Sequence, residues 1–430
     1  MEFVILTEKE FTEFADNHEN KSFFQTTKIA NIREKNGWKA HFVGVKDKDK
    51  ILAATMMVEK TTFAGHKTFY APGGPLIDYE NHDLLTFFVT ELKKYLKENK
   101  AYVFHIDPYY ELIERDRDGQ IVKDGFTHEQ AAENLKKLGF KPLKVSEQPK
   151  YLFATDINGR TPDELLESFK GNTRNKIAKT EKHGIKIVEL KKQDLTRFKK
   201  ITEETSKRRG FHDKSLDYYE TMYDLFGKEV KFLVAEIDLK DYKNRLTASL
   251  TSLEKELSSL DKELRDAQKS LENPERDQGK DNQLKKKIKR IENSKKPVES
   301  AIEDAKKRLE DAKQIKEDKL DLSAAMFVLY GDEIIYLFSG SYEEYMKFDA
   351  QYLIQWYMIK YAAEHGFKRY NFYGIQGLPD PKAKDYGVYE FKRGFGGRVI
   401  ELLGSYELPI SPLYKAHNSL SKIKKIIKRR

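Results

Sequence analysis

A long stretch of heptad-spaced apolar residues, between positions 240 and 318, is the feature of this 430-residue sequence that most constrains its fold. In its first run the apolar residues alternate four and three positions apart: Leu246, Leu250, Leu253, Leu257, Leu260, Leu264, Ala267 and Leu271. A second run, from Leu284 to Ala312, follows the same spacing, with Lys295 at one of the apolar positions. Such spacing gives each helix one narrow apolar stripe that faces a partner helix.

Pro274 and Gly279 stand between the two runs, and they end one helix and allow the chain to reverse. The stretch therefore predicts an antiparallel coiled-coil arm, about 50 Å long at 1.5 Å per residue. A globular core has no need of such an arm, so we expect it to contact something outside the core.

The segments on either side of the arm are predicted strands of a unit that occurs twice. In the second half, strands at 231–237, 322–330, 333–339 and 368–375 accompany a helix at 350–365. In the first half, strands at 40–46, 51–59, 68–76 and 101–108 and a helix at 83–97 follow the same β-β-β-α-β order. There a three-residue turn, where an insertion disturbs neither strand, takes the place of the arm.

This order predicts an α/β (α+β) protein with two similar domains. The first would span residues 1–147 and be completed by residues 400–430, and the second would span residues 148–400. The arm at 240–318 would be an insertion in the second domain.

Composition limits the class of protein. No apolar run approaches the roughly 18 residues of a membrane-spanning helix, and the N-terminal residues do not resemble a signal peptide. The sequence has no cysteine, which excludes disulfides and cysteine chemistry and is consistent with a cytoplasmic enzyme. The net charge is +9, and no acidic residue follows Glu407. RNA, phosphorylated substrates or anionic lipid would suit this charge, but a solvated lysine-rich surface would explain each basic segment equally well.

The repeated unit resembles the fold of GNAT acyltransferases. Neither copy has the Arg/Gln-x-x-Gly-x-Gly/Ala loop with which GNAT acetyltransferases bind the pyrophosphate of coenzyme A. The corresponding segments read PGGP from Pro72 and GSYEE from Gly340. An acyl donor other than acyl-CoA is therefore favoured.

Four further segments, in this order, resemble the Fem family of non-ribosomal peptidyltransferases of Gram-positive cell-wall synthesis. They read FKGNTRNKIAKTEKHGIKI from Phe169, RRGFHDKSLDYY from Arg208, NFYGIQGLPDP from Asn371 and YEFKRGFGG from Tyr389. The resemblance implies two tandem GNAT-like domains. It also implies transfer of an amino acid (Gly, Ser or Ala) from aminoacyl-tRNA to the stem-peptide side-chain amine of a peptidoglycan precursor, or to a growing cross-bridge.

The acceptor implied is a UDP-linked or lipid-linked muropeptide. Ester aminolysis of this kind needs two aligned substrates, a neutral amine and stabilisation of an oxyanion. It needs no covalent enzyme intermediate, and we expect no cofactor other than aminoacyl-tRNA as co-substrate, and no metal.

Lys392 is the main catalytic candidate, because it matches the Phe-Lys pair that the family associates with the transfer step. A fixed ammonium there would stabilise negative charge on the reacting carbonyl, although a lysine beside two glycines at a tight bend could also be structural. Phe391 would shape the pocket, and Arg393 is a candidate for phosphate. Asp107, which ends a strand before Pro108, could accept the proton of the attacking amine, but aspartate before proline is also a common turn device.

The resemblance implies that basic and tyrosine side chains bind the diphosphate and sugar of the acceptor. Arg33 is the nearest counterpart in the first copy. Lys214 and Tyr218 occupy a basic-x-x-x-Tyr position in the second copy, with lysine where arginine is usual, and Tyr345 is a further match. Arg33 could also be an ordinary surface residue, and Tyr218 could belong to the core.

The arm is predicted to contact tRNA, since helical hairpins of this shape can reach along a tRNA. Its densest basic patch consists of Lys285, Lys286, Lys287, Lys289 and Arg290, although the arm as a whole is close to neutral. The C-terminal sequence SKIKKIIKRR could dock on the inner face of the membrane if the acceptor is lipid-linked. We expect a monomer. Two alternatives stay open: an acyl-CoA-dependent GNAT N-acyltransferase, and a non-catalytic binding protein that recruits a partner through the arm.

Overall fold

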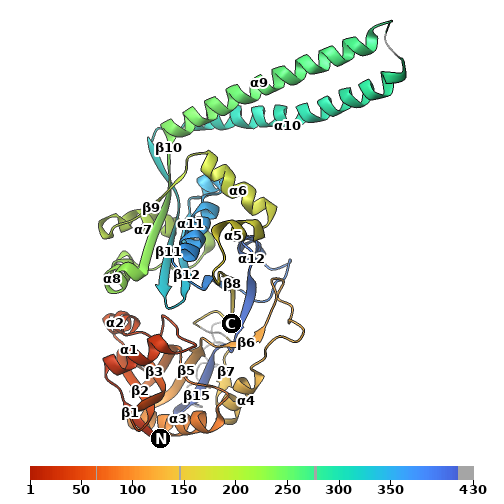
Figure 1. Ribbon diagram of the computed structural model, residues 1–430. Coiled ribbons are helices and arrows are strands. Elements are labelled where there is room, and N and C mark those ends of the chain that lie inside the picture. The colour runs from red at the N-terminus through yellow and green to blue at the C-terminus, as the bar shows by residue number, and fades with distance from the viewer. Residues whose placement is uncertain (64, 145–146, 276–277, 415–430) are drawn as a thin grey trace, which may run out of the picture.

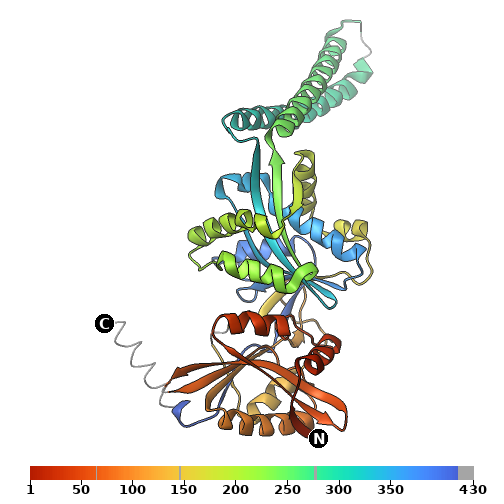
Figure 2. The ribbon, with the colours of Figure 1, turned by 90° about the vertical axis from the view of Figure 1, so that its left-hand side faces the viewer.

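The computed structural model describes residues 1–63, 65–144, 147–275 and 278–414, and its parts form three tiers (Figure 1). A sheet with its helices lies at the N-terminal end, a second sheet lies above it, and two long helices project from the second sheet. Figure 2 shows the same tiers from another side. The mixture of helices and sheets confirms the predicted α/β (α+β) class.

The first sheet has, among the described residues, seven strands in the order β1-β2-β3-β4-β5-β15-β7. They are β1 (Glu2–Ile5), β2 (Lys39–Asp47), β3 (Lys50–Phe63), β4 (His66–Gly73), β5 (Ala101–Pro108), β7 (Lys141–Pro142) and β15 (Tyr406–Pro409). One face packs against α1 (Glu8–Asn17) and α2 (Thr27–Lys35), and the other against α3 (His82–Glu98) and α4 (Glu129–Lys137). The strand β15 thus returns from near the C-terminus to pair with β5 and β7.

The second sheet has eight strands in the described part of the chain, in the order β6-β14-β8-β13-β12-β11-β10-β9. They are β6 (Glu111–Glu114), β8 (Tyr151–Asp156), β9 (Lys186–Glu189), β10 (Val230–Asp238), β11 (Lys319–Tyr330), β12 (Glu333–Ser341), β13 (Arg369–Ile375) and β14 (Arg398–Leu402). Its helices are α5 (Pro162–Ser168), α6 (Gly171–Lys182), α7 (Leu195–Arg209), α8 (Leu216–Phe226), α11 (Ala350–Glu364) and α12 (Tyr386–Arg393). Short 3₁₀ turns are η1 (Lys192–Asp194), η2 (Gly227–Glu229), η3 (Gln278–Lys280) and η4 (Glu343–Phe348).

Each sheet contains the predicted β-β-β-α-β unit, as β2-β3-β4-α3-β5 and as β10-β11-β12-α11-β13. In both units the last strand runs parallel to the third. The parallel pairs differ in extent, because β4 and β5 stay paired as far as Gly73 and Pro108, whereas β12 and β13 are paired only as far as Ile335 and Asn371. The second unit therefore opens at the end of its parallel pair, where the first stays closed.

The two units are joined in more than one way. The strand β6, from the first half of the chain, pairs with β14 in the second sheet. One hydrophobic core also spans both units, with Phe11 and Met56 from the first and Phe198 and Phe232 from the second. The domain boundary at residues 147 and 148 therefore stays a prediction, since sheet membership crosses it.

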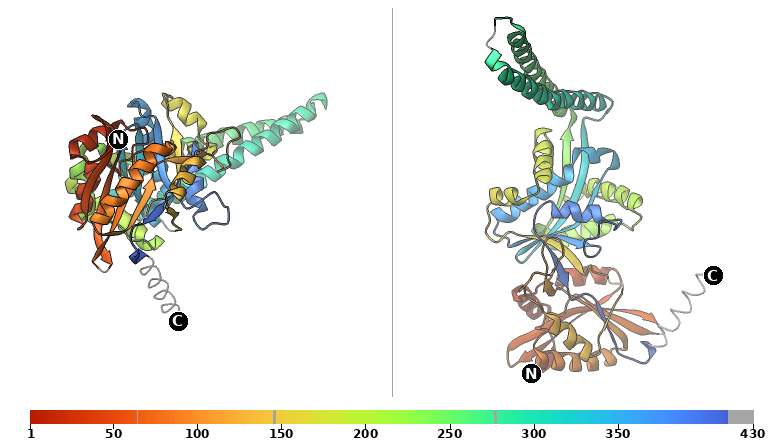
Figure 3. Two further views of the ribbon diagram at one scale, coloured as in Figure 1. Left: turned by 90° about the horizontal axis from the view of Figure 1, so that it is seen from below. Right: turned by 90° about the vertical axis from the view of Figure 1, so that its right-hand side faces the viewer.

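The arm consists of α9 (Leu239–Glu272) and α10 (Asp281–Lys313), which connect β10 to β11 as an antiparallel helical hairpin (Figure 3). Buried side chains occupy the predicted heptad positions: Leu246, Ala267, Ile291, Val298, Ile302, Ala305 and Ala312. Lys295, which interrupts the apolar stripe, forms an ion pair with Asp261 of the facing helix at 2.6 Å. A charge between the helices is thus compensated across the hairpin.

Candidate active site

Asp107 ends β5 as a buried carboxylate, with only 6% of its surface exposed. One oxygen accepts a hydrogen bond from the Gly73 amide at 2.7 Å, and the other accepts one from the Tyr70 hydroxyl at 2.5 Å. Burial raises the pKa of this carboxyl to about 7, although both hydrogen bonds favour the ionised form. These partners lie on the neighbouring strand β4, so Asp107 is not a local turn device.

The backbone that receives Asp107 is fixed by its own contacts. Gly73 has φ +67°, a conformation that favours glycine, and β4 ends there rather than at residue 76 as predicted. The fully buried side chain of Gln25 donates to the carbonyls of Met56 at 2.9 Å and Pro72 at 2.8 Å. The amide that binds Asp107 is therefore held in place before any substrate binds.

Arg33, on α2, lies beside this carboxylate. Its guanidinium is 5.6 Å from the ring centre of Tyr70 and 5.9 Å from that of Trp38, and it is 3.5 Å from the Glu147 carboxylate. The charge of Arg33 opposes the rise in the Asp107 pKa. The predicted acceptor-binding cation and the predicted proton acceptor are thus brought together, although the sequence separates them widely.

Tyr218 and Lys214 approach the same place from the second unit, at the start of α8. The Lys214 ammonium is 5.4 Å from the ring centre of Tyr218, although Lys214 precedes the N-cap Ser215 and is not part of the helix. Burial raises the pKa of Tyr218 to about 12, against the nearby charge of Arg33. Tyr218 also packs against Phe338 of β12. Arg33 and Tyr218 therefore line one site from opposite units.

Lys392, on α12, is buried with 5% of its surface exposed. Its ammonium donates to the carbonyl of Gly374 at 2.6 Å and to that of Tyr373 at 3.3 Å. No carboxylate pairs with it in the part of the chain that the structure describes. Burial alone lowers its pKa to about 7, so both Lys392 and Asp107 can exchange a proton near neutrality.

Tyr373 connects these two groups, and it was not among the predicted site residues. Its φ of +63° is unusual for a residue other than glycine, and it turns two successive carbonyls toward Lys392. Burial raises the pKa of the Tyr373 phenol, and Asp107 and Tyr218 act in the same direction. Its hydroxyl donates to Gln148. The motif NFYGIQG contains Tyr373, but the sequence gives no sign of its backbone conformation.

The two residues that flank Lys392 in the sequence, Phe391 and Arg393, make their contacts with other side chains. Phe391 packs against Tyr352, with ring centres 4.9 Å apart, and against Phe395 at 5.4 Å. Arg393 pairs with Asp118 and, at 3.0 Å, with Glu390, so its charge is already compensated. The roles of Phe391 in shaping the pocket and of Arg393 in holding phosphate stay predictions.

Other predicted residues lie away from this cluster. Tyr345, in η4, packs against Tyr342 and Phe348, next to the base of the arm. The predicted tRNA patch lies at the outer end of α10, and all its side chains are exposed: Lys285, Lys286, Lys287, Lys289 and Arg290. Their roles stay predictions. The predicted membrane-docking sequence at 421–430 lies outside the described residues.

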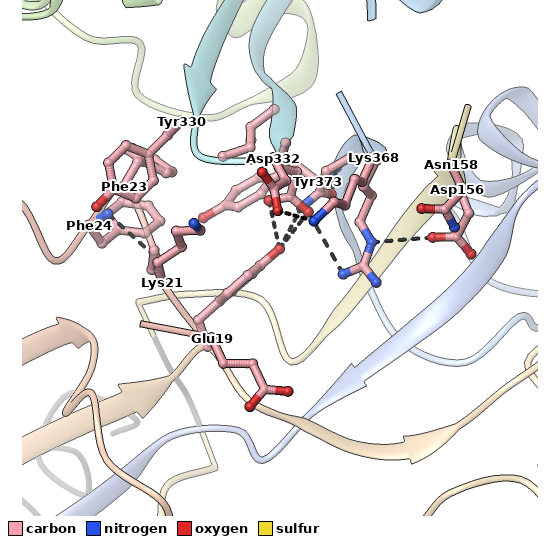
Figure 4. A pocket seen from close by; sticks show the side chains of 16 residues that line it. Glu19, Lys21, Phe23, Phe24, Asp156, Asn158, Tyr330, Asp332, Lys368 and Tyr373 are labelled. Atoms are coloured by element: carbon pink, nitrogen blue, oxygen red, sulfur yellow. Dashed lines mark hydrogen bonds and ion pairs between the residues drawn. The ribbon is translucent and has the colours of Figure 1, made fainter. Parts of the chain in front are cut away.

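A polar pocket of about 260 Å³ lies between the units, and Tyr373 forms part of its wall (Figure 4). The Tyr109 hydroxyl, just after β5, donates to both oxygens of Glu333 at 2.8 Å, and Arg369 lies 3.9 Å from the same carboxylate. Burial raises the pKa of Glu333, against the charge of Arg369. These contacts tie the end of β5 to β12 and β13, and so fix Asp107 relative to Lys392.

The described residues contain no group of three or more His, Cys, Asp or Glu side chains that could hold a metal ion. Among the same residues, no helix is both long and apolar enough to cross a membrane.

Comparison with known proteins gives consistent matches along the chain. The model of the FemAB family matches residues 6–422. Aminoacyltransferase FemA of Staphylococcus aureus (strain MRSA252) is 30% identical over 431 residues, which cover 99% of this chain and 99% of that protein. The crystal structure of FemX has a TM-score of 0.69 at 26% identity and covers 97% of this chain and 99% of that chain. Both matches therefore extend over almost the whole of this chain and of the protein compared.

Proposed function

Because the chain belongs to the FemAB family and is an aminoacyltransferase of peptidoglycan synthesis, we propose that it transfers an amino acid from aminoacyl-tRNA to an amine of a peptidoglycan precursor. The amine belongs to the stem-peptide side chain or to a growing cross-bridge, and the precursor is a UDP-linked or lipid-linked muropeptide. The observation that carries the proposal is that Asp107 and Lys392 both lie beside Tyr373. The Tyr373 carbonyl accepts a hydrogen bond from Lys392, and the charge of Asp107 acts on the Tyr373 phenol. Asp107 and Lys392 both have a pKa of about 7.

The reaction needs one proton acceptor and one fixed positive charge. In the proposed mechanism the Asp107 carboxylate takes a proton from the acceptor amine, and the neutral amine attacks the ester carbonyl of the donor. The Lys392 ammonium stabilises the oxyanion that forms. The oxyanion forms together with the new C–N bond. When the oxyanion collapses, the ester C–O bond breaks and the proton held by Asp107 passes to the leaving oxygen of the tRNA ribose. The regenerated Asp107 carboxylate then takes the second proton from the nitrogen of the new amide and releases it to solvent.

Each unit would bind one substrate. Arg33, Lys214 and Tyr218 supply two cations and a phenol for the diphosphate and sugar of the acceptor. The donor lies over the second unit, which carries Lys392, and the arm extends along the tRNA through the patch at 285–290. We propose that the enzyme acts as a monomer in the cytoplasm, where charged tRNA is made.

Mass spectrometry of a muropeptide incubated with the protein and a mixture of aminoacyl-tRNAs tests the proposal directly. The expected product is heavier by one amino-acid residue, and its mass identifies that residue. Absence of product with every aminoacyl-tRNA, on both UDP-linked and lipid-linked acceptors, would contradict the proposal. Thermal stabilisation by coenzyme A would point instead to an acyl-CoA-dependent enzyme.

A further inference from the structure

The short segment Glu147–Pro149, which joins β7 of the first sheet to β8 of the second, lies over the candidate active site. The Glu147 carboxylate is 3.5 Å from the Arg33 guanidinium. The Gln148 side chain accepts a hydrogen bond from Tyr373 and also hydrogen-bonds Tyr70. The segment therefore contacts a predicted acceptor-binding residue and both aromatic residues that flank Asp107.

Pro149 closes the other side of the site. It packs on Gly374 so closely that a Cβ added there would lie 2.9 Å from the proline ring. The carbonyl of Gly374 is the nearer acceptor for Lys392, at 2.6 Å. Three consecutive residues of the connection thus cover the surroundings of both reactive groups.

Beneath these contacts Asp107 and Lys392 are almost inaccessible, with 6% and 5% of their surfaces exposed. Two substrates must nevertheless reach them during transfer. The weakest contact of the cover is the Glu147 ion pair, because that side chain is 59% exposed and its distance to Arg33 is long. Arg33, by contrast, is already oriented by the two aromatic rings beside it, and a diphosphate offers it more charge and more acceptor oxygens than one carboxylate does.

We propose that Glu147–Pro149 is a strap that closes the acceptor site, and that the diphosphate of the acceptor opens it by replacing the Glu147 carboxylate on Arg33. The inference rests on the proposed function, since it takes a diphosphate-bearing muropeptide as the acceptor. In the closed state Gln148 holds Tyr70 and Tyr373 together over Asp107. In the open state Gln148 no longer joins Tyr70 to Tyr373, and the acceptor amine can reach Asp107 between the two rings.

Binding measurements test the displacement without any transfer step. Glu147→Gln removes the competing charge, so we expect UDP-linked muropeptide to bind about two- to fivefold more tightly than to the wild type. Glu189→Gln is the matched control, because Glu189 is also about half exposed and pairs with Lys231 far from the site. The affinity of Glu189→Gln for UDP-linked muropeptide should equal that of the wild type. A second experiment measures binding of farnesyl-diphosphate-linked muropeptide. Tighter binding of either acceptor by Glu147→Gln supports the strap, and the acceptor that binds more tightly identifies the source of the diphosphate.

Unchanged or weaker binding of both acceptors by Glu147→Gln would overturn the proposal. Motion of the strap is measured separately by thiol labelling. Because the chain has no cysteine, Pro149→Cys places a single thiol against Gly374. Its labelling by a thiol reagent should accelerate when muropeptide is added, and an unchanged or slower rate would count against opening. A protein that binds muropeptide in this way but transfers nothing would refute the proposed reaction and leave the strap standing.

Discussion

The two units of the chain finish their parallel strand pairs differently, and the candidate active site lies where they differ. In the first unit β4 and β5 stay paired to their ends, and the Gly73 amide and the Tyr70 hydroxyl point at a buried carboxylate. In the second unit β12 and β13 separate, and two carbonyls point at a buried ammonium. One unit therefore supplies donors around Asp107, and the other supplies acceptors around Lys392.

The difference shows how a repeated fold can place opposite charges in one site. In a closed pair the carbonyls at the end of the two strands accept hydrogen bonds from across the pair, whereas in a separated pair the carbonyls no longer reach the other strand of that pair, and these can hold a cation. Burial then shifts both pKa values toward neutrality from opposite sides, because it penalises whichever form is charged. If this contrast underlies function, removing the charge of Asp107 or of Lys392 should lower the transfer rate more than changing Tyr373, which lies between them.

The largest loss is expected for Lys392→Met, which keeps the length of the side chain and removes its charge. Loss of a fixed donor to an oxyanion costs on the order of 10²–10³ in rate, so the transfer rate at saturating substrates should fall by that factor. Lys384→Met, which changes an exposed lysine before α12, is the control and should leave the rate unchanged. Near-full activity of Lys392→Met in a quenched transfer assay would remove this residue from the mechanism.

Asp107→Asn should lower the transfer rate by about 10²-fold, the lower range for loss of a general base. Asparagine still accepts hydrogen bonds from Gly73 and Tyr70, so the fold should be kept. The carboxylate must be ionised to take a proton, so the wild-type rate should rise with pH through about 7, the pKa of Asp107. It should fall again at higher pH as Lys392, also with a pKa of about 7, loses its charge. A pH–rate profile of Asp107→Asn that keeps the acidic limb would show that another group titrates.

The folding stability of the wild type and that of Lys392→Met should also respond differently to pH. Lys392 has its pKa lowered from 10.5 to about 7 in the folded state, so above pH 7 the unfolded chain binds a proton that the folded chain does not. Stability should therefore rise with pH between about 7 and 10.5, by up to about 1.4 kcal/mol per pH unit. Urea unfolding of wild type and Lys392→Met at pH 7 and pH 9 isolates this contribution, since every other group is shared. Equal changes in both proteins would mean that Lys392 is not buried as an unpaired amine.

The two units also differ in one strand connection. A short turn joins β2 to β3 in the first unit, whereas the long arm joins β10 to β11 in the second. Joining residue 249 to residue 303 through a short loop would shorten the arm while keeping Tyr242 and Leu246 at its base. We expect the KM for aminoacyl-tRNA to rise about tenfold, as for loss of several phosphate contacts, with muropeptide binding unchanged. Replacing the five basic residues of the patch by glutamine separates charge from length. An equal loss of both substrates would assign the arm to folding instead.

The sequence predicted the parts of this comparison that local pattern controls. The heptad spacing located both arm helices, and the alternation of strands located both units, because hydrophobic periodicity reflects which face is buried. It could not predict that Gly73 would reach Asp107, since this depends on the register of two strands distant in the chain. The φ of Tyr373 was equally hidden, because it is imposed by the contacts around β13 and not by residue preference. Lys392 and Asp107 were therefore found by resemblance and position, whereas the residue between them required the structure.

The smallest effect is expected for Tyr373→Phe, which tests whether the side chain or the backbone of this residue joins the two units. The substitution removes the hydroxyl that binds Gln148 but leaves the carbonyls that bind Lys392. We expect a two- to fivefold change in the KM for muropeptide and almost no change in the maximal rate, because the backbone orients the ammonium. Tyr109→Phe, which removes a hydroxyl from Glu333 beside the same pocket, is the comparison for a purely structural phenol. A large fall in the maximal rate of Tyr373→Phe alone would show that the phenol itself takes part in proton transfer.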